Sequence, residues 1–157
     1  MDTKILGTDK KVSKAFRLFV DYDRSIEDGV KAGKYKFANH DIVRENWISE
    51  VGEVGKKERF FVLYCFGRTI RSHAVIEEIK RDGRTPGTIK DLLAIGELLP
   101  ELQKQSPIIA LGSLFGHPSE YKEVGQLTSD HWGRKLFLYW DRTNWDGRCQ
   151  FLAMNKS

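Results

Sequence analysis

The chain has 157 residues, with 26 Lys and Arg against 22 Asp and Glu, which gives a formal net charge of +4. That length suits one domain, and a hydrophobic fraction of 40% with plentiful aromatic residues excludes an intrinsically disordered protein. The first residues lack the apolar core of a signal peptide, and no run approaches the roughly 20 apolar residues of a membrane span. We therefore expect a cytoplasmic protein with no membrane partner.

Two segments of the N-terminal half carry the same pattern. Residues 16–26 align with residues 60–70 at a constant offset, and both are aromatic-rich apolar runs that end in a polar turn with a serine nearby. Such a run suits a strand, and the serine suits a helix N-cap. The pattern predicts two strand-turn-helix units, with strands at 16–22 and 60–66, helices at 26–32 and 72–81, N-caps Ser25 and Ser72, and Arg24 and Arg68 at matched junctions.

The segment between the two units is predicted to be a long loop. Residues 34–59 are mostly polar and contain Gly52 and Gly55, while Trp47 and Ile48 are expected to be buried anchors within it. After the second unit, Thr88 and Asp91 form the capping box of a further helix.

The C-terminal third changes from a helical to an extended pattern. After a short helix at 100–105, four apolar runs are separated by Gly, Pro, Asp and Asn clusters, which predicts a mainly antiparallel sheet whose last two strands form a hairpin. The strands are expected at 108–111, 121–127, 135–140 and 149–154. The fold class is therefore α+β, a single globular domain over 1–157 in which 1–13 is the candidate flexible segment.

Two resemblances accompany these patterns. The runs 100–103, 107–113 and 148–153 resemble a group of short uncharacterised bacterial proteins, a likeness that brings no function with it. The helix start at 83–88 and the strands after it, in the C-terminal half of this chain, resemble the C-terminal part of bacterial C-type-lectin-like domains. The disulfides and the Glu-Pro-Asn triplet of the secreted lectins are absent, so calcium-dependent sugar binding is not carried over.

Aromatic residues are concentrated near the C-terminus. Trp132, Trp140 and Trp145 fall close together, and the turn between the last two predicted strands carries Arg142 beside Trp145. Such residue types concentrate in binding hot spots and in stacking surfaces for bases or sugars. The alternative is that these rings pack the sheet. We predict an exposed indole at Trp145 and a binding surface that includes Trp132, Arg142 and Trp145.

The matched arginines, Arg24 and Arg68, have two interpretations. Each can hold a local carboxylate or carbonyl in the same way, or the two can mark a pseudo-symmetric anion site, and on the second interpretation they join the candidate binding residues.

Catalytic and metal-binding patterns are weak. His117 and His131 flank Glu120 and Asp130, but the spacing matches no helix-borne histidine pair, and no Cys-x-x-Cys, nucleophile elbow or phosphate loop occurs. We predict no cofactor and no metal. The leading hypothesis is a non-catalytic binding or regulatory module for a protein or small ligand. Nucleic-acid binding is the first alternative, although basic residues are scattered, and an enzyme with a site around His117 and His131 is the second.

Overall fold

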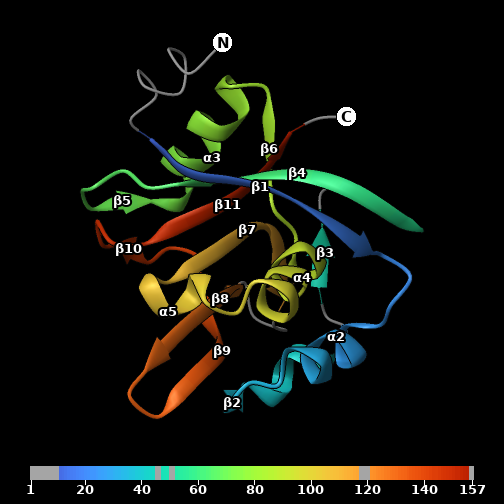
Figure 1. Ribbon diagram of the computed structural model, residues 1–157. Helices are drawn as coiled ribbons and strands as arrows, with labels where there is room; N and C mark the ends of the chain where they lie inside the picture. The colour runs from blue at the N-terminus through green and yellow to red at the C-terminus, as the bar shows by residue number, and fades with distance from the viewer. Residues whose placement is uncertain (1–10, 45–46, 50–51, 117–120, 156–157) are drawn as a thin grey trace.

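The computed structural model describes residues 11–44, 47–49, 52–116 and 121–155, which form one large sheet with helices on both faces (Figure 1). The sheet contains β1 (Val12–Asp21), β2 (Phe37–Ala38), β3 (Trp47–Ser49), β4 (Lys56–Tyr64), β6 (Arg84–Pro86), β7 (Ile108–Gly116), β8 (Lys122–Asp130), β9 (Gly133–Trp140) and β11 (Gln150–Asn155). A second, two-stranded sheet pairs β5 (Ile70–Arg71) with β10 (Asn144–Trp145). The helices are α2 (Ile26–Gly33), α3 (Ser72–Arg81), α4 (Ile89–Leu98), α5 (Leu102–Gln105) and the 3-10 helix η1 (His40–Arg44).

The large sheet is mixed rather than purely antiparallel. Its order is β1-β4-β11-β7-β8-β9-β2, and the pairs β11-β7 and β9-β2 are parallel. All four C-terminal strands are confirmed, but the predicted hairpin between the last two is wrong. The chain leaves β9, crosses the sheet through β10, and inserts β11 between β4 and β7.

Two hydrophobic cores lie on the two faces of the sheet. One is covered by α2 and α4 and contains Leu92 and Ile95 of α4, and the other is covered by α3 and contains Val75 and Ile79. The predicted alternation of the final strand is confirmed, because Cys149, Phe151 and Ala153 belong to the α3 core while Leu152 and Met154 belong to the other. The protein is therefore a mixed α+β fold that forms a single compact domain.

Both predicted strand-turn-helix units are present as β1 with α2 and β4 with α3, although the two-residue strand β5 is inserted in the second. The strands β1 and β4 are antiparallel neighbours. Aligned residues face opposite sides of the sheet, since Leu18 packs on the core under α2 and α4 whereas Val62 packs on the core under α3. In each unit, the aligned positions of the strand therefore face the helix of that unit.

The helix caps are only partly as predicted. Ser25 accepts a hydrogen bond from the Asp28 backbone N–H at 3.0 Å, and the capping box of Thr88 and Asp91 is complete. Ser72 is not an N-cap, because it is the first residue of α3 and its hydroxyl donates to the Asp141 carbonyl at 2.6 Å. Its side chain is used to fasten a distant loop instead.

The predicted loop at 34–59 and the predicted N-terminal segment both contain regular structure. The loop region carries β2, η1 and β3, and within it Trp47 is half-buried while Ile48 is 60% exposed, so Ile48 is not a buried anchor. Residues 12 and 13 of the predicted flexible segment belong to β1, and residues 1–10 lie outside the described residues. Both cysteines are free thiols. Within the described residues, no helix has the length and apolar character needed to span a membrane.

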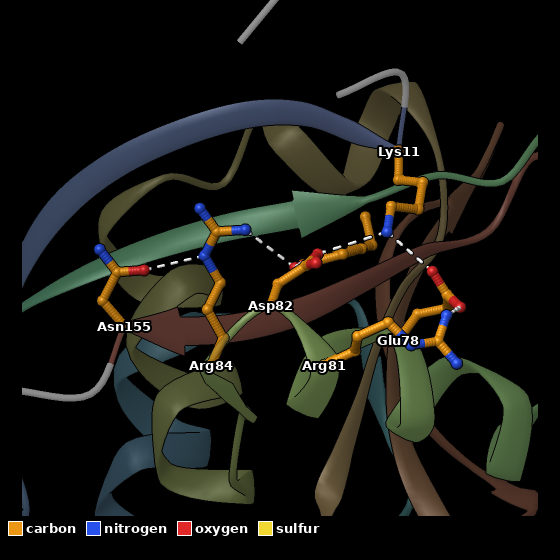
Figure 2. Close-up of polar contacts among 7 residues, drawn as sticks. Lys11, Glu78, Arg81, Asp82, Arg84 and Asn155 are labelled. Atoms are coloured by element: carbon orange, nitrogen blue, oxygen red, sulfur yellow. Dashed lines mark hydrogen bonds and ion pairs between the residues drawn. The ribbon is translucent and has the colours of Figure 1, made fainter. Parts of the chain in front are cut away.

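A polar cluster joins the end of α3 to three strands (Figure 2). Lys11 donates to Glu78 at 2.7 Å and also contacts Asp82, whose carboxylate accepts from the Tyr64 hydroxyl at 2.7 Å. Arg84 bonds that same hydroxyl and also reaches the side chain of Asn155 at 2.8 Å. Each charged side chain of the cluster has a partner within it, so this cluster supports the fold rather than a ligand.

The polar cluster predicts a loss of stability in acid. The hydrogen bond from Lys11 lowers the pKa of Glu78 below 4.5. At Asp82 burial raises the pKa, but the hydrogen bond from the Tyr64 hydroxyl and the charge of Lys11 outweigh burial and hold the pKa below 3.8. A carboxyl group whose folded pKa is depressed stabilises the fold above its unfolded pKa, and that stability is lost as pH falls through the folded value. We expect the free energy of unfolding, measured in urea, to fall below about pH 4.5.

The substitution Lys11→Met should partly flatten that acid profile, because Glu78 and Asp82 then lose one of the cations that depress their pKa values, while Arg81 and Arg84 remain. Lys31→Met, which removes an exposed ion pair with Glu27, is the matched control and should leave the profile parallel to that of the parent. Parallel profiles for both variants would contradict this assignment.

Candidate functional site

A cleft of about 710 Å³ lies on the α3 side of the sheet, and we call it the α3 cleft. It is larger than two other clefts, of about 320 and about 220 Å³, and its volume is typical of small-molecule sites. Five separate segments line it: α3 with the residue before it, β7, β3, β8 and the loop after β9. The lining residues are Ile48, Arg71, Ser72, His73, Ile76, Lys80, Leu111, Gly112, Leu114, Val124, Asp141 and Arg142.

Helical periodicity places one row of α3 in the cleft. One face of α3 lines the cleft wall with His73, Ile76 and Lys80, which recur at helical spacing. Another face of the same helix points into the α3 core, where Val75 and Ile79 are fully buried. The helix therefore presents an apolar side chain between a histidine and a lysine.

An irregularity in β7 forms the opposite wall. The register between β7 and β8 shifts between Ala110 and Phe115, and over this stretch β7 exchanges its partner β11 for β3. Gly112 sits at the shift, where a Cβ would lie 2.4 Å from the Pro86 carbonyl oxygen, so a side chain has no room there. Such bulges are common beside binding sites. Here the bulge sets Leu111 and Leu114 in the cleft.

The rim of the α3 cleft is mainly basic. Among the described lining residues, Arg71, Lys80 and Arg142 are cationic and Asp141 is the one acid. The loop that carries Arg142 is fastened to α3, because the Ser72 hydroxyl donates to the Asp141 carbonyl and accepts from the Trp145 indole N–H at 2.9 Å. These bonds hold the backbone on either side of Arg142, which lines the cleft and is exposed.

The structure separates the three residues of the predicted aromatic surface. Trp132 is 66% exposed and its ring contacts that of His131 in a tilted arrangement at the turn before β9. Arg142 is exposed after the other end of that strand, about 26 Å away at the usual rise per residue. The predicted exposed indole at Trp145 is wrong. Its ring is 2% exposed and packs between Tyr139 and Phe151 in the α3 core, because β10 turns it inward against Ile70.

The two matched arginines make different contacts. Arg24 forms an ion pair with Glu97 of α4 at 2.7 Å and lines the cleft of about 320 Å³ on the α4 side of the sheet. Arg68 donates to the carbonyl of its neighbour Thr69 at 3.4 Å and is exposed. Only Arg24 holds a carboxylate, and α2 and α3 lie on opposite faces, so the two junctions do not build one site.

The residues of the enzyme hypothesis are only partly described. His117 and Glu120 lie outside the described residues. Of the others, His131 is exposed, and Asp130 accepts a hydrogen bond from Lys135 at 2.6 Å, which lowers the pKa of that carboxyl. Within the described part of the chain, no group of three His, Cys, Asp or Glu side chains is placed to hold a metal ion.

A buried polar group at the start of α4 is the other concentration of titratable side chains. Asp91 is fully buried, and it accepts from the Tyr22 hydroxyl at 2.5 Å and from the Thr88 backbone at 2.8 Å. Burial raises the pKa of Asp91, and these hydrogen bonds oppose that rise. Nearby, Arg59 pairs with Glu53 at 2.6 Å. The Asp91 carboxylate caps its own helix and bonds a neighbouring strand end, which is a structural role.

Sequence reasoning missed most of the α3 cleft. Lys80 looks like part of a solvated helix face, and Arg71 and His73 belong to no motif. The available signal was the row formed by His73, Ile76 and Lys80, in which an apolar residue interrupts a basic face. The remaining walls come from strands far away in the chain.

No protein-family model, no curated protein and no solved structure matches this chain. The resemblances to short bacterial proteins and to C-type-lectin-like domains therefore remain predictions.

Proposed function

We propose that the chain is a non-catalytic binding module whose ligand occupies the α3 cleft and carries both a negative charge and an apolar body. The observation that supports this most is the composition of the cleft. Its floor and walls are apolar, with Leu111, Leu114 and Val124 contributed by the sheet, while its rim is basic. An apolar cavity with a few polar groups that fix orientation is the usual form of a ligand site.

The hydroxyl group of the cleft fits binding better than catalysis. Ser72 is the hydroxyl-bearing residue of the lining, and its oxygen already bonds the Asp141 carbonyl and the Trp145 indole. A serine nucleophile instead needs a base within hydrogen-bond reach of its hydroxyl. Arginine at the rim suits recognition of a carboxylate or phosphate, since its donors can form two parallel bonds.

We expect Arg142→Ala to weaken binding of a small anionic aromatic probe, anilinonaphthalene sulfonate, by about tenfold, which is the usual size of one charge-assisted hydrogen bond. The neutral counterpart of the probe, without the sulfonate, should bind both proteins equally. Fluorescence titration measures both affinities. Arg148→Ala is the matched control, because Arg148 is an exposed arginine on the other side of β10 that does not line the cleft.

A second variant tests the apolar part of the cleft. Leu114→Trp should reduce the affinity for both probes, because the larger side chain occupies the cavity. Equal affinities of the parent, Arg142→Ala and Leu114→Trp proteins for the anionic probe would show that the ligand site lies elsewhere.

A further inference from the structure

A row of side chains continues from the α3 cleft along β9. Lys135, Phe137 and Tyr139 alternate with core residues on β9 and therefore share the α3 face of the sheet, on which Tyr139 contacts the core indole of Trp145. Phe37 of β2 joins them, with its ring 5.4 Å from that of Phe137. We call these four residues the β9 strip.

The helix α3 does not cover the β9 strip. In Figure 1 the hairpin of β8 and β9 projects at the bottom of the molecule, away from α3 at the top. The exposed fractions agree, since Phe37 is 48% and Tyr139 is 45% exposed. Large aromatic rings thus face outward on an uncovered part of the sheet, which is unusual enough to indicate an interaction surface.

The β9 strip and the α3 cleft are continuous. Tyr139 pairs with Val124 across β8 and β9, and Val124 lines the cleft. Arg142, on the rim, follows the end of β9 by two residues. At the other end of the strand, Trp132 lies on the turn that precedes β9. One surface therefore runs from the basic rim to a row of rings.

We propose that the α3 cleft and the β9 strip together bind single-stranded nucleic acid, with phosphates at the basic rim and bases stacked on the rings of the strip. This inference rests on the proposed function, because it names the anionic ligand of the same site. Bases of a single strand expose their faces and stack on aromatic side chains without regard to sequence. Alternate residues of a strand are about 7 Å apart, so Phe137 and Tyr139 can each take a base of an extended chain.

Charge favours a nucleic acid over a protein as the occupant. The rim carries Arg71, Lys80 and Arg142 against Asp141, and Lys135 lies 6.0 Å from the ring of Phe137 while paired with Asp130. With a net charge of +4, the whole chain also attracts a polyanion at long range. A duplex hides its base faces, so the exposed rings favour a single strand over a double strand.

The experiment is a fluorescence anisotropy titration with a labelled DNA or RNA single strand of about 15 nucleotides, which is within the range that one such surface covers. Affinity should fall steeply as salt is raised. Phe37→Ala should weaken binding about tenfold, as the loss of one stacked base does. Tyr139→Leu should act similarly, and leucine retains apolar contact with Trp145 so that the fold is kept, as thermal denaturation verifies. Arg142→Ala should lower the salt slope by about one.

Phe19→Ala is the matched control, because Phe19 is a 67% exposed ring of β1, remote from the strip in the order of the sheet. It should leave the affinity unchanged. The proposal is overturned if no oligonucleotide binds at low salt, or if the duplex binds as tightly as the single strand. It is also overturned if heparin displaces the oligonucleotide equally well from the parent protein and from the Phe37→Ala and Tyr139→Leu variants. If the anionic naphthalene probe still depends on Arg142 in those cases, the cleft binds a smaller anion and the proposed function stands. If that dependence fails too, both proposals are wrong.

Discussion

Trp145→Ala is expected to reduce the free energy of unfolding by about 3–5 kcal/mol, the usual loss for truncation of a buried aromatic ring to alanine. The indole is 2% exposed and makes an edge-to-face contact with Phe151 at 6.1 Å. Its removal leaves a cavity beside α3, where neither β10 nor the sheet can collapse without shifting the loop that holds Arg142. Urea denaturation followed by far-UV circular dichroism measures the effect.

Trp132→Ala is the matched control for Trp145→Ala. It removes the same side chain from a 66% exposed position and should change stability by no more than about 0.5 kcal/mol. Trp145→Phe separates packing from hydrogen bonding, because phenylalanine keeps most of the ring but cannot donate to Ser72. We expect a loss of about 1 kcal/mol beyond the change in ring size. Similar stabilities of the Trp145→Ala and Trp132→Ala proteins would show that Trp145 is not a core residue.

The burial of Trp145 shows where local reasoning about a turn fails. Asp141, Asn144 and Gly147 are turn-forming residues, and their spacing correctly places a polar connection after β9. That spacing does not reveal that Asn144 and Trp145 form a short strand on Ile70 and Arg71. The partner lies more than seventy residues earlier, and nothing in the loop itself specifies it.

Strand positions could be predicted because alternation is a local property, and strand partners could not because pairing is a long-range one. The pattern of Cys149, Phe151 and Ala153 correctly assigns one face of β11. This alternation is compatible with a hairpin to β9 and equally compatible with the observed position between β4 and β7. The central position of β11 explains why both of its faces are apolar, a feature that is visible in the sequence and typical of a buried strand.

The α3 cleft was hidden from the sequence for the same physical reason. Arg142 was a predicted binding residue, and the structure places it at the rim. Of the other cations, Arg71 comes from β5 and Lys80 from α3, and the apolar floor comes from β7 and β8. Arg24 and Arg68 show the converse, since an offset in the sequence that aligns two arginines did not bring them to one face of the sheet.

Gly96→Ala is expected to destabilise the protein by about 2 kcal/mol even though alanine favours helices. Gly96 lies in α4, and a Cβ there would be 1.8 Å from the hydroxyl oxygen of Tyr35. The Tyr35 ring cannot move away from this Cβ, because its other edge already packs against Gly33, where a Cβ would lie 2.3 Å from the ring. The Arg134 guanidinium also lies 4.9 Å from the ring centre. Overpacking of this kind costs up to about 3 kcal/mol, which exceeds the roughly 1 kcal/mol gained from helix propensity.

Arg134 makes the region around Tyr35 especially rigid. Its guanidinium donates to the Gly96 carbonyl and to Gln103, each at 3.1 Å, and to the Gly33 carbonyl, so it ties α2, α4 and α5 to β9. Any displacement of Tyr35 must disturb these bonds. The strain from an alanine at position 96 therefore spreads to the ends of three helices rather than relaxing within one side chain.

The hydroxyl of Tyr35 provides the decisive control for Gly96→Ala. Within the described residues it is buried without a hydrogen-bond partner, so Tyr35→Phe alone should leave stability unchanged or raise it by up to about 1 kcal/mol. Combined with Gly96→Ala, it removes the atom at 1.8 Å and should restore about half of the lost stability, the nearest remaining ring atom being 2.8 Å away. Gly52→Ala, at a glycine with no atom within 4 Å of its Cβ position, should be neutral or slightly stabilising. Thermal and urea denaturation of the four variants tests the set, and a Gly96→Ala loss that Tyr35→Phe does not relieve would show that the clash with the hydroxyl is not its cause.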